Sequence, residues 1–160
     1  MVAVPKIELS KNMPMKLLYT AQATVEGGRE GVVRTRDGNL KLQLGTPSAL
    51  GGKGGEVTNP EELFAAGYAA CFQSALQRIA FQSKVPLPRS STLTALVGLG
   101  KQDSGAFSLA VELQIHLPGL NETVAHELVE KAHQICPYSN ATRGNIEVKL
   151  TVQTAETANV

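Results

Sequence analysis

The sequence predicts one α+β domain with largely antiparallel sheet. Two observations carry this prediction. Segments rich in β-forming residues follow one another in runs, and the two helical segments do not alternate with single strands as βαβ units would require. The expected order of elements is βββ-α-ββ-α-β. A chain of 160 residues is long enough for one hydrophobic core and short for two.

The first expected elements are three strands joined by short turns. Residues 1–14 show no periodicity and contain two prolines, so we expect a loose arm there. The following segments are β-rich, and glycine-rich turns separate them. In the third strand, strict alternation places Leu40, Leu42 and Leu44 on one face. The predicted strands are 17–25, 32–35 and 40–44, with turns at 27–31 and 37–39.

A long helix follows the flexible, glycine-rich loop 45–59. Asn59 is a suitable N-cap, Pro60 suits the first helical position, and Glu61 complements the helix dipole in the first turn. The helix is expected to run to about Lys84. Between Leu63 and Phe81 it is apolar almost all round, so we expect a central helix buried on most sides.

The remainder of the chain predicts two strands, a second helix and a last strand. A turn at 103–105 joins the two strands, and Asn121 is the expected N-cap of the second helix, which should end at Cys136-Pro137. The predicted strands are 92–100, 107–117 and 146–152, followed by a polar tail from Thr154.

Charge and hydropathy narrow the choice of partners and compartment. The net charge of +1 favours neither nucleic acid nor an anionic membrane as a partner. No apolar run approaches the ~18 residues of a membrane span, and the first residues lack a signal-peptide pattern. We therefore expect a cytoplasmic protein. In that reducing compartment its two cysteines should be catalytic, metal-binding or simply buried.

The two cysteines are the main candidates for chemistry. Cys71 lies on an apolar stripe in the middle of the long helix, where a cysteine usually acts as a small hydrophobic residue. Cys136 directly precedes Pro137 at a helix end, where its side chain can be accessible. A redox pair is the alternative to two structural cysteines, and it requires that one thiol be made reactive.

Arg29 is the candidate cation for such a thiol, because it lies in a glycine-rich hairpin turn that can present it to a neighbouring surface. The alternative is a solvated arginine. Glu61 is ten residues before Cys71, which is ~15 Å along a helix, so the two cannot easily share one arginine within the same helix. An antiparallel copy of the helix from a second subunit would solve this, which favours a dimer with shared sites. Otherwise Glu61 only complements the helix dipole.

Two histidines invite a metal-site hypothesis. His126, His133 and Cys136 have spacings that place them on one helix face. The set lacks a fourth ligand of clear spacing, so we favour solvated histidines and expect no metal.

Four segments together resemble the organic hydroperoxide resistance (Ohr) proteins of the OsmC/Ohr superfamily. The similarity extends from about Met15 to Val152, and the continuation after Cys136 resembles the Ohr branch rather than the OsmC branch. The segments are Gly28-Arg29, residues 50–55, residues 58–72 and residues 136–145.

The resemblance implies a thiol peroxidase that reduces alkyl and fatty-acid hydroperoxides. Cys71 would be the peroxidatic cysteine and Cys136 the resolving one, with Arg29 and Glu61 forming the active-site salt bridge. No bound cofactor is implied. A dihydrolipoyl group, as dihydrolipoamide or on a lipoylated protein, would be the reductant. The implied fold is an intertwined homodimer in which the sheets wrap around two central helices.

The apolar surroundings of Cys71 would favour alkyl chains over hydrogen peroxide. The expected substrate-binding residues are Phe64, Tyr68, Phe72 and Ile79. Two alternatives stay open: an OsmC-like general stress peroxidase, and a non-catalytic protein that binds lipid or senses peroxide.

Overall fold

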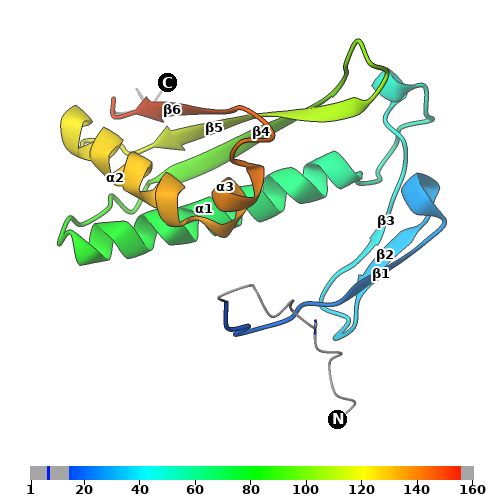
Figure 1. The fold of residues 1–160 in the computed structure, drawn as a ribbon, viewed down its shortest axis with the longest axis horizontal. Helices are drawn as coiled ribbons and strands as arrows, with labels where there is room; N and C mark the ends of the chain where they lie inside the picture. The colour runs from blue at the N-terminus through cyan, green and yellow to red at the C-terminus, as the bar shows by residue number, and fades with distance from the viewer. Residues whose placement is uncertain (1–6, 8–14, 156–160) are drawn as a thin grey trace. The chain divides into compact units, whose positions relative to one another are not determined.

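The computed structural model describes Ile7 and residues 15–155. Most of the predicted N-terminal arm and the end of the polar tail lie outside these residues. The described chain is α+β, as predicted, and its contacts divide it into two compact units, one ending at Pro60 and the other beginning at Glu61 (Figure 1). That the two units form a single domain stays a prediction.

The first unit contains the predicted three-stranded antiparallel meander, in the order β1-β2-β3. It buries little apolar surface: Val33 and Leu44 are the buried apolar residues among those described here, and Leu42 is 37% exposed. The face of alternating leucines is therefore covered only at its end. The elements are β1 (Ala23–Glu26), the 3₁₀ turn η1 (Gly28–Glu30), β2 (Val32–Thr35), β3 (Lys41–Gln43) and a second 3₁₀ turn η2 (Ser48–Leu50).

The first strand is shorter than predicted, beginning at Ala23 rather than at residue 17. The register explains the difference. Ala23 pairs with Thr35, the last residue of β2, and just beyond this pair the Arg36 N–H donates a hydrogen bond to the Gln22 carbonyl. Leu18 before it is 91% exposed. A β-rich sequence without a partner strand has nothing to hold it extended.

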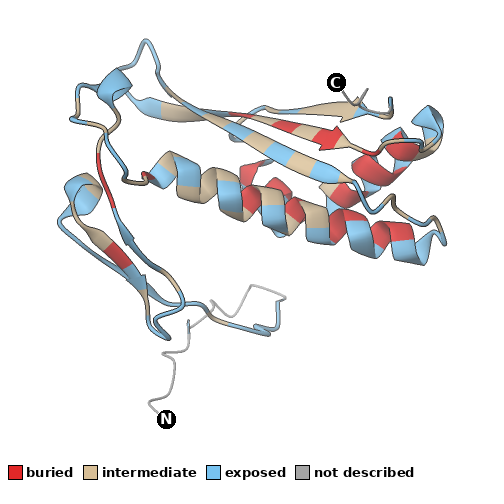
Figure 2. Ribbon diagram, turned by 180° about the vertical axis from the view of Figure 1, so that it is seen from behind, coloured by how far each residue is buried: buried red, intermediate tan, exposed pale blue. Residues whose placement is uncertain are grey.

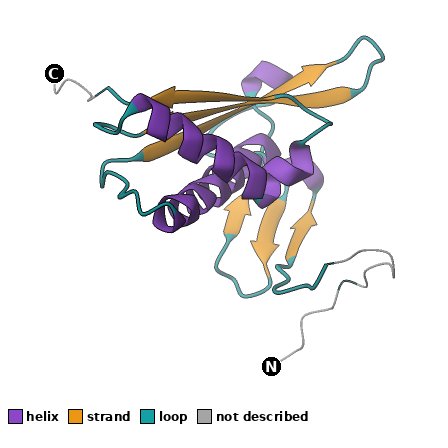
Figure 3. Ribbon diagram, turned by 60° about the vertical axis from the view of Figure 1, so that its left-hand side comes forward, coloured by secondary structure: helices purple, strands orange, loops and turns teal. Residues whose placement is uncertain are grey.

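In the second unit, helices cover one face of a three-stranded sheet (Figures 1 and 3). α1 begins after buried Asn59 with proline at its first position, as predicted. Asn121 caps α2, and its side-chain oxygen accepts a hydrogen bond from the Val124 N–H. The helices are α1 (Pro60–Gln82), α2 (Glu122–Ile135) and α3 (Pro137–Thr142), and the strands are β4 (Thr92–Lys101), β5 (Phe107–His116) and β6 (Val148–Gln153).

One strand pairing departs from the antiparallel prediction. β4 and β5 form the expected antiparallel hairpin, but β6 lies parallel to β5, with Val111 opposite Val148. The chain leaves the end of β5 and travels back along the helical layer through α2 and α3 before it enters β6 (Figure 1). Such a helical crossover returns the chain to the starting end of β5, which makes the pairing parallel. The prediction placed no helix after Cys136, and α3 was missed.

The core lies between this sheet and its helices. On β5, Val111, Leu113 and Ile115 alternate toward the helices and are buried (Figure 2). They belong to one cluster with buried residues of α1 and α2. The largest helix residues of the cluster are Tyr68, Phe72, Leu76, Leu128 and Val129.

α1 is buried on one side rather than on most sides. Tyr68, Phe72 and Ile79 face the core, whereas Ser74 and Phe81 are exposed, Phe81 by 86%. The sheet and the other helices of this unit cover only one face of α1. Among the described residues, no helix is both long enough and apolar enough to cross a membrane.

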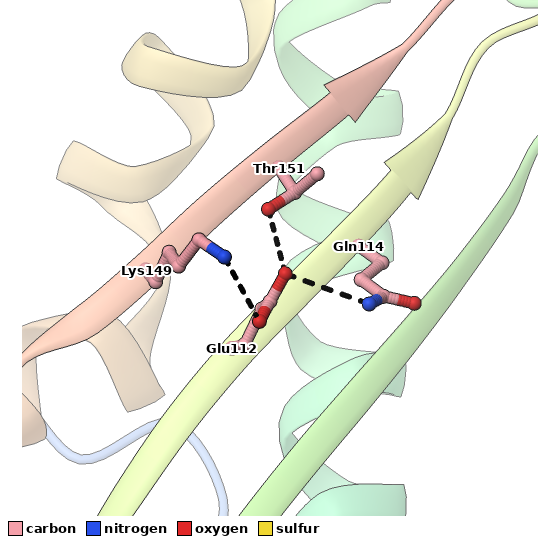
Figure 4. Close-up of polar contacts among 4 residues, drawn as sticks. All are labelled: Glu112, Gln114, Lys149 and Thr151. Carbon is pink, nitrogen blue, oxygen red and sulfur yellow. Dashed lines mark hydrogen bonds and ion pairs between the residues drawn. The ribbon is translucent and has the colours of Figure 1, made fainter.

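A polar cluster ties the parallel strands together on the opposite face of the sheet (Figure 4). The Glu112 carboxylate accepts hydrogen bonds from Thr151 Oγ1 at 2.7 Å and from Gln114 Nε2 at 3.5 Å. Lys149 Nζ lies 3.2 Å from the same carboxylate, directly opposite it in the register. These contacts lower the pKa of Glu112, with the Thr151 hydrogen bond as the main cause.

Candidate active site

The two cysteines, far apart in the sequence, lie side by side in the second unit. Both are free, and their Sγ atoms are 3.7 Å apart. A disulfide bond is about 2.05 Å long, so the sulfurs need to approach by roughly 1.7 Å. The structure thus brings together the two residues that the sequence singled out, at a distance suited to a reversible disulfide.

Cys136 is held at this position by the proline that follows it. A proline disfavours helical geometry in the preceding residue, and Cys136 has extended backbone angles of φ −65° and ψ 123°. Pro137 therefore ends α2 and opens α3 at the same point. The Cys136 N–H still closes α2 by donating to the carbonyl of Ala132.

The exposure of the two cysteines differs from the prediction, most clearly for Cys136. Cys136, expected to be accessible at a helix end, is fully buried and belongs to the core cluster. Cys71, expected on a buried stripe, is half-buried. The unexpected α3 keeps the chain folded against the core after Pro137, whereas the helices and sheet of this unit cover only one side of α1.

The pKa of the Cys71 thiol is raised, chiefly because burial disfavours the thiolate. The neighbouring Cys136 raises this pKa further, whereas a hydrogen bond from the Tyr138 backbone N–H lowers it. An amide donor aimed at the sulfur stabilises the thiolate. On balance, these contacts favour the protonated thiol.

This amide donor was not predicted, because α3 was not predicted from the sequence. Pro137 is itself a helix-start signal, since proline is favoured at the first helical position. With α3 placed from that signal, the N–H of Tyr138 would have fallen in the first turn of a helix beside Cys136.

A buried hydrogen-bond network lies beside the cysteines. The Tyr68 hydroxyl, on α1, is 3.0 Å from Ser139 Oγ and 3.3 Å from Thr142 Oγ1, both on α3. On the other side, Ser139 Oγ is 2.9 Å from Nδ1 of His133, on α2. Tyr68 and Ser139 are fully buried. The network therefore joins three helices within the core.

An aromatic cluster stands next to this network. The ring of Tyr138 packs 5.9 Å from Phe64 and 5.6 Å from Tyr68, measured between ring centroids. Gly67 makes room for it: a Cβ atom there would lie 2.8 Å from the Tyr138 hydroxyl oxygen.

Phe64, Tyr138 and Thr142 also line a cavity of about 580 Å³ between α1, α3 and the β4–β5 hairpin. Its walls combine apolar side chains with a few polar ones. The other principal wall residues are Leu99, Phe107, Leu109, Asn145 and Ile146.

The predicted substrate-binding residues occupy different environments. Phe64 is half-buried and faces the cavity. Tyr68 and Phe72 are fully buried, and Ile79 is only 8% exposed. A role for these four residues in substrate binding stays a prediction.

Arg29 and Glu61 belong to different units. Arg29 lies half-buried in the predicted turn between β1 and β2, where Gly27 and Gly28 adopt positive φ angles of 79° and 57°. Glu61 stands in the first turn of α1, as predicted. Their salt bridge and its approach to Cys71 stay a prediction.

The histidines occupy different positions on α2. His126 is exposed, and His133 is half-buried beside Ser139. Burial lowers the pKa of His133, and the charge of Arg143 adds to this. Within Ile7 and residues 15–155, no three His, Cys, Asp or Glu side chains gather as a metal would require.

The sequence is similar to those of known proteins of one family. The sequence model of the OsmC-like protein family matches residues 52–151. An organic hydroperoxide resistance protein of Xanthomonas axonopodis pv. citri is 54% identical over 139 residues, covering 87% of this chain and 97% of that protein. Organic hydroperoxide resistance protein OhrB of Bacillus subtilis is 44% identical over 135 residues, covering 83% and 96%.

Solved structures show the same fold. A crystal structure of an organic hydroperoxide resistance protein from Legionella pneumophila superposes with a TM-score of 0.82 at 51% identity, covering 87% of this chain and all of that one. One from Elizabethkingia anophelis, with thiocyanate bound, gives a TM-score of 0.83 at 51% identity, covering 88% and 99%.

Proposed function

The chain belongs to the OsmC-like protein family, with organic hydroperoxide resistance proteins among its relatives, and on this premise we propose that it is a cysteine-based peroxidase that reduces organic hydroperoxides to alcohols. The observation that carries the proposal is the 3.7 Å separation of Cys71 Sγ and Cys136 Sγ. Two structural cysteines would need no such proximity, whereas a peroxidatic and a resolving cysteine require it.

In the first step, the Cys71 thiolate attacks one oxygen of the hydroperoxide. The O–O bond breaks, the alkoxide leaves and takes up a proton as the alcohol, and Cys71 becomes a sulfenic acid. The half-buried Cys71 is the sulfur that a substrate reaches, while the fully buried Cys136 is not. This division of exposure supports Cys71 as the peroxidatic residue.

In the second step, the thiol of Cys136 attacks the Cys71 sulfenic acid. A disulfide forms and water leaves. A dihydrolipoyl dithiol then reopens the disulfide by two thiol exchanges and is oxidised to its cyclic disulfide. This reductant follows from the resemblance to the Ohr proteins.

We assign to Arg29 the role of stabilising the thiolate and polarising the peroxide, with Glu61 orienting it. The raised pKa of Cys71 supports the need for such a cation, because one hydrogen bond from the Tyr138 N–H does not offset the burial of the sulfur. A guanidinium near the sulfur would restore the reactive form at neutral pH.

The apolar part of the substrate would occupy the cavity lined by Phe64, Tyr138 and Leu109.

Two features favour a homodimer. One side of α1 carries the exposed ring of Phe81, and the β1–β3 meander buries little apolar surface. A second copy of the chain would cover such surfaces. We place the protein in the cytoplasm, where its cysteines would be kept reduced between turnovers.

The test is steady-state consumption of cumene hydroperoxide with dihydrolipoamide as the reductant, compared with hydrogen peroxide and with monothiol reductants. Sustained turnover with the organic peroxide and the dithiol is expected. Preference for hydrogen peroxide would favour a general stress peroxidase. A single stoichiometric oxidation without turnover would favour a sensor, and both results would refute the proposal.

A further inference from the structure

The hydrogen-bond donor that reaches Cys71 belongs to a very short helix. The Tyr138 N–H donates to the Cys71 sulfur from the first turn of α3, which has only six residues. Its N-cap, Cys136, makes no side-chain capping hydrogen bond. An isolated helix of this length is unstable in water. Contacts with the rest of the unit must therefore fix α3 and its amide.

The polar side chains of α3 provide such contacts. Ser139 Oγ, fully buried, lies 3.0 Å from the Tyr68 hydroxyl and 2.9 Å from His133 Nδ1. A hydroxyl has one donor and two acceptor sites, so Ser139 can serve both partners at once. Thr142 adds a contact of 3.3 Å to the same Tyr68 hydroxyl.

The partners of Ser139 stand one helical turn before the two cysteines. Tyr68 precedes Cys71 by three residues on α1, and His133 precedes Cys136 by three residues on α2. Residues three apart lie on the same helix face. Through Tyr68 and His133, Ser139 thus connects the part of α1 next to Cys71 with the end of α2 next to Cys136.

The last turn of α3 is fixed to α2 as well. Arg143 Nη2 donates to the His133 carbonyl at 2.9 Å, and Nη1 donates to Asn140 Oδ1 at 2.6 Å. The charged groups that influence the His133 ring are this Arg143 and Glu130. Both ends of α3 are therefore held, and its buried links are the contacts of Ser139 and Thr142 with the Tyr68 hydroxyl.

We propose that Ser139 and Tyr68 are positioning residues that hold the Tyr138 N–H against the Cys71 sulfur. This rests on the proposed function only in taking Cys71 as the reactive thiol. Neither side chain needs to touch the hydroperoxide. Tyr68, expected from the sequence to bind substrate, acts instead through α3. Without the network, α3 shifts, the amide leaves the sulfur, and the thiolate becomes harder to form.

The test compares Tyr68→Phe and Ser139→Ala with the matched control Ser74→Ala. Tyr68→Phe removes one oxygen atom and keeps the ring in the core. Ser74 is an exposed serine of α1 whose hydroxyl bonds only within its own helix, to the Ala70 carbonyl. The measurement is the rate of Cys71 alkylation by iodoacetamide as a function of pH, on reduced protein without hydroperoxide, with the modified cysteine identified by peptide mass.

Loss of one hydrogen bond to the reactive form should slow Cys71 alkylation at pH 7 about fivefold and move the midpoint of its pH profile upward. We expect this in Tyr68→Phe and Ser139→Ala but not in Ser74→Ala. Thermal unfolding monitors folding, and if Ser139→Ala does not fold, Tyr68→Phe decides alone.

A wild-type alkylation profile in folded Tyr68→Phe would overturn the proposal. This holds even if the KM of that variant for hydroperoxide changes, because a changed KM alone would indicate a role in substrate binding. Because the assay contains no hydroperoxide, its result is separate from the peroxidase test. A wild-type protein that fails to turn over would refute the proposed function, not this inference.

Discussion

The ring of Tyr138 lies across Gly67, so closely that a Cβ at residue 67 would stand 2.8 Å from the tyrosine hydroxyl oxygen. The glycine is in the interior of α1, where glycine is less favourable than alanine by about 1 kcal/mol. Its presence is explained by the space that the ring needs. The same tyrosine supplies the amide next to Cys71 and one wall of the cavity.

Gly67→Ala should therefore lower activity while leaving the free energy of unfolding almost unchanged. The gain in helix propensity offsets the displacement of a movable side chain, so the free energy of unfolding should change by less than about 1 kcal/mol. Turnover of organic hydroperoxide should fall several-fold because the Tyr138 ring moves. Denaturant unfolding and steady-state kinetics measure the two quantities. Unchanged kinetics would show that the ring position is unimportant.

The two cysteines should give different products when each is replaced. Cys71→Ser should abolish hydroperoxide consumption, because the sulfur that meets the substrate is gone. Without a reductant, Cys136→Ser should still consume one equivalent to give the Cys71 sulfenic acid, and further equivalents only as that acid is oxidised to higher oxides. Mass spectrometry of the protein after one equivalent of cumene hydroperoxide distinguishes these outcomes. An active Cys71→Ser protein would contradict the assignment of roles.

Arg29→Ala should raise the pKa of Cys71 further, whereas Arg29→Lys should restore part of the effect. Because only the thiolate reacts, the rate of Cys71 alkylation increases with pH up to the pKa of the thiol. The profile of Arg29→Ala should lie at higher pH than that of the wild type, and Arg29→Lys should fall between them. Arg34→Ala, in the neighbouring strand, is the control for loss of a charge. Coinciding profiles for Arg29→Ala and wild type would exclude Arg29 as the cation.

Glu112→Gln should lower the free energy of unfolding at neutral pH, and by less as the solution becomes more acidic. The folded state lowers the pKa of Glu112, so its carboxylate stabilises the fold above the pKa that it has in the unfolded chain. The stabilisation is lost as the pH falls through the lowered pKa in the folded state. In thermal unfolding, the difference from the wild type should be largest at pH 7 and should shrink as the pH is lowered toward 3. Glu147→Gln is the control, and an equal loss in both variants would argue against a specific role of the cluster.

Much of the fold could be predicted because its signals are local. The glycines of the first hairpin, the Asn59-Pro60 helix start and the Asn121 cap are properties of a few adjacent residues, and the structure confirms each of them. The parallel pairing of β6 could not be predicted in this way. It depends on how the chain returns through α3. That helix was not predicted, because Pro137 was interpreted only as the end of the preceding helix.

Two residues of the candidate site could be singled out from the sequence, but their arrangement could not. The motifs identified Cys71 and Cys136, and the structure brings their sulfurs together. How deeply each one is buried depends on the elements that surround it, and the full burial of Cys136 was not predicted. The Tyr138 N–H carries no side-chain signal at all, since every residue except proline has such a group.

If Cys71 and Cys136 act as we propose, the short distance between their sulfurs would determine how long an oxidised Cys71 survives. A well-oriented neighbour in the same molecule reacts as if it were present at roughly 10⁵ M or more. Dissolved hydroperoxide cannot compete with that concentration for the sulfenic acid. In the proposed cycle, the sulfur of Cys136 would protect Cys71 from over-oxidation: a burst of oxidant would end in a disulfide that thiols can reduce, and not in an irreversible sulfinate.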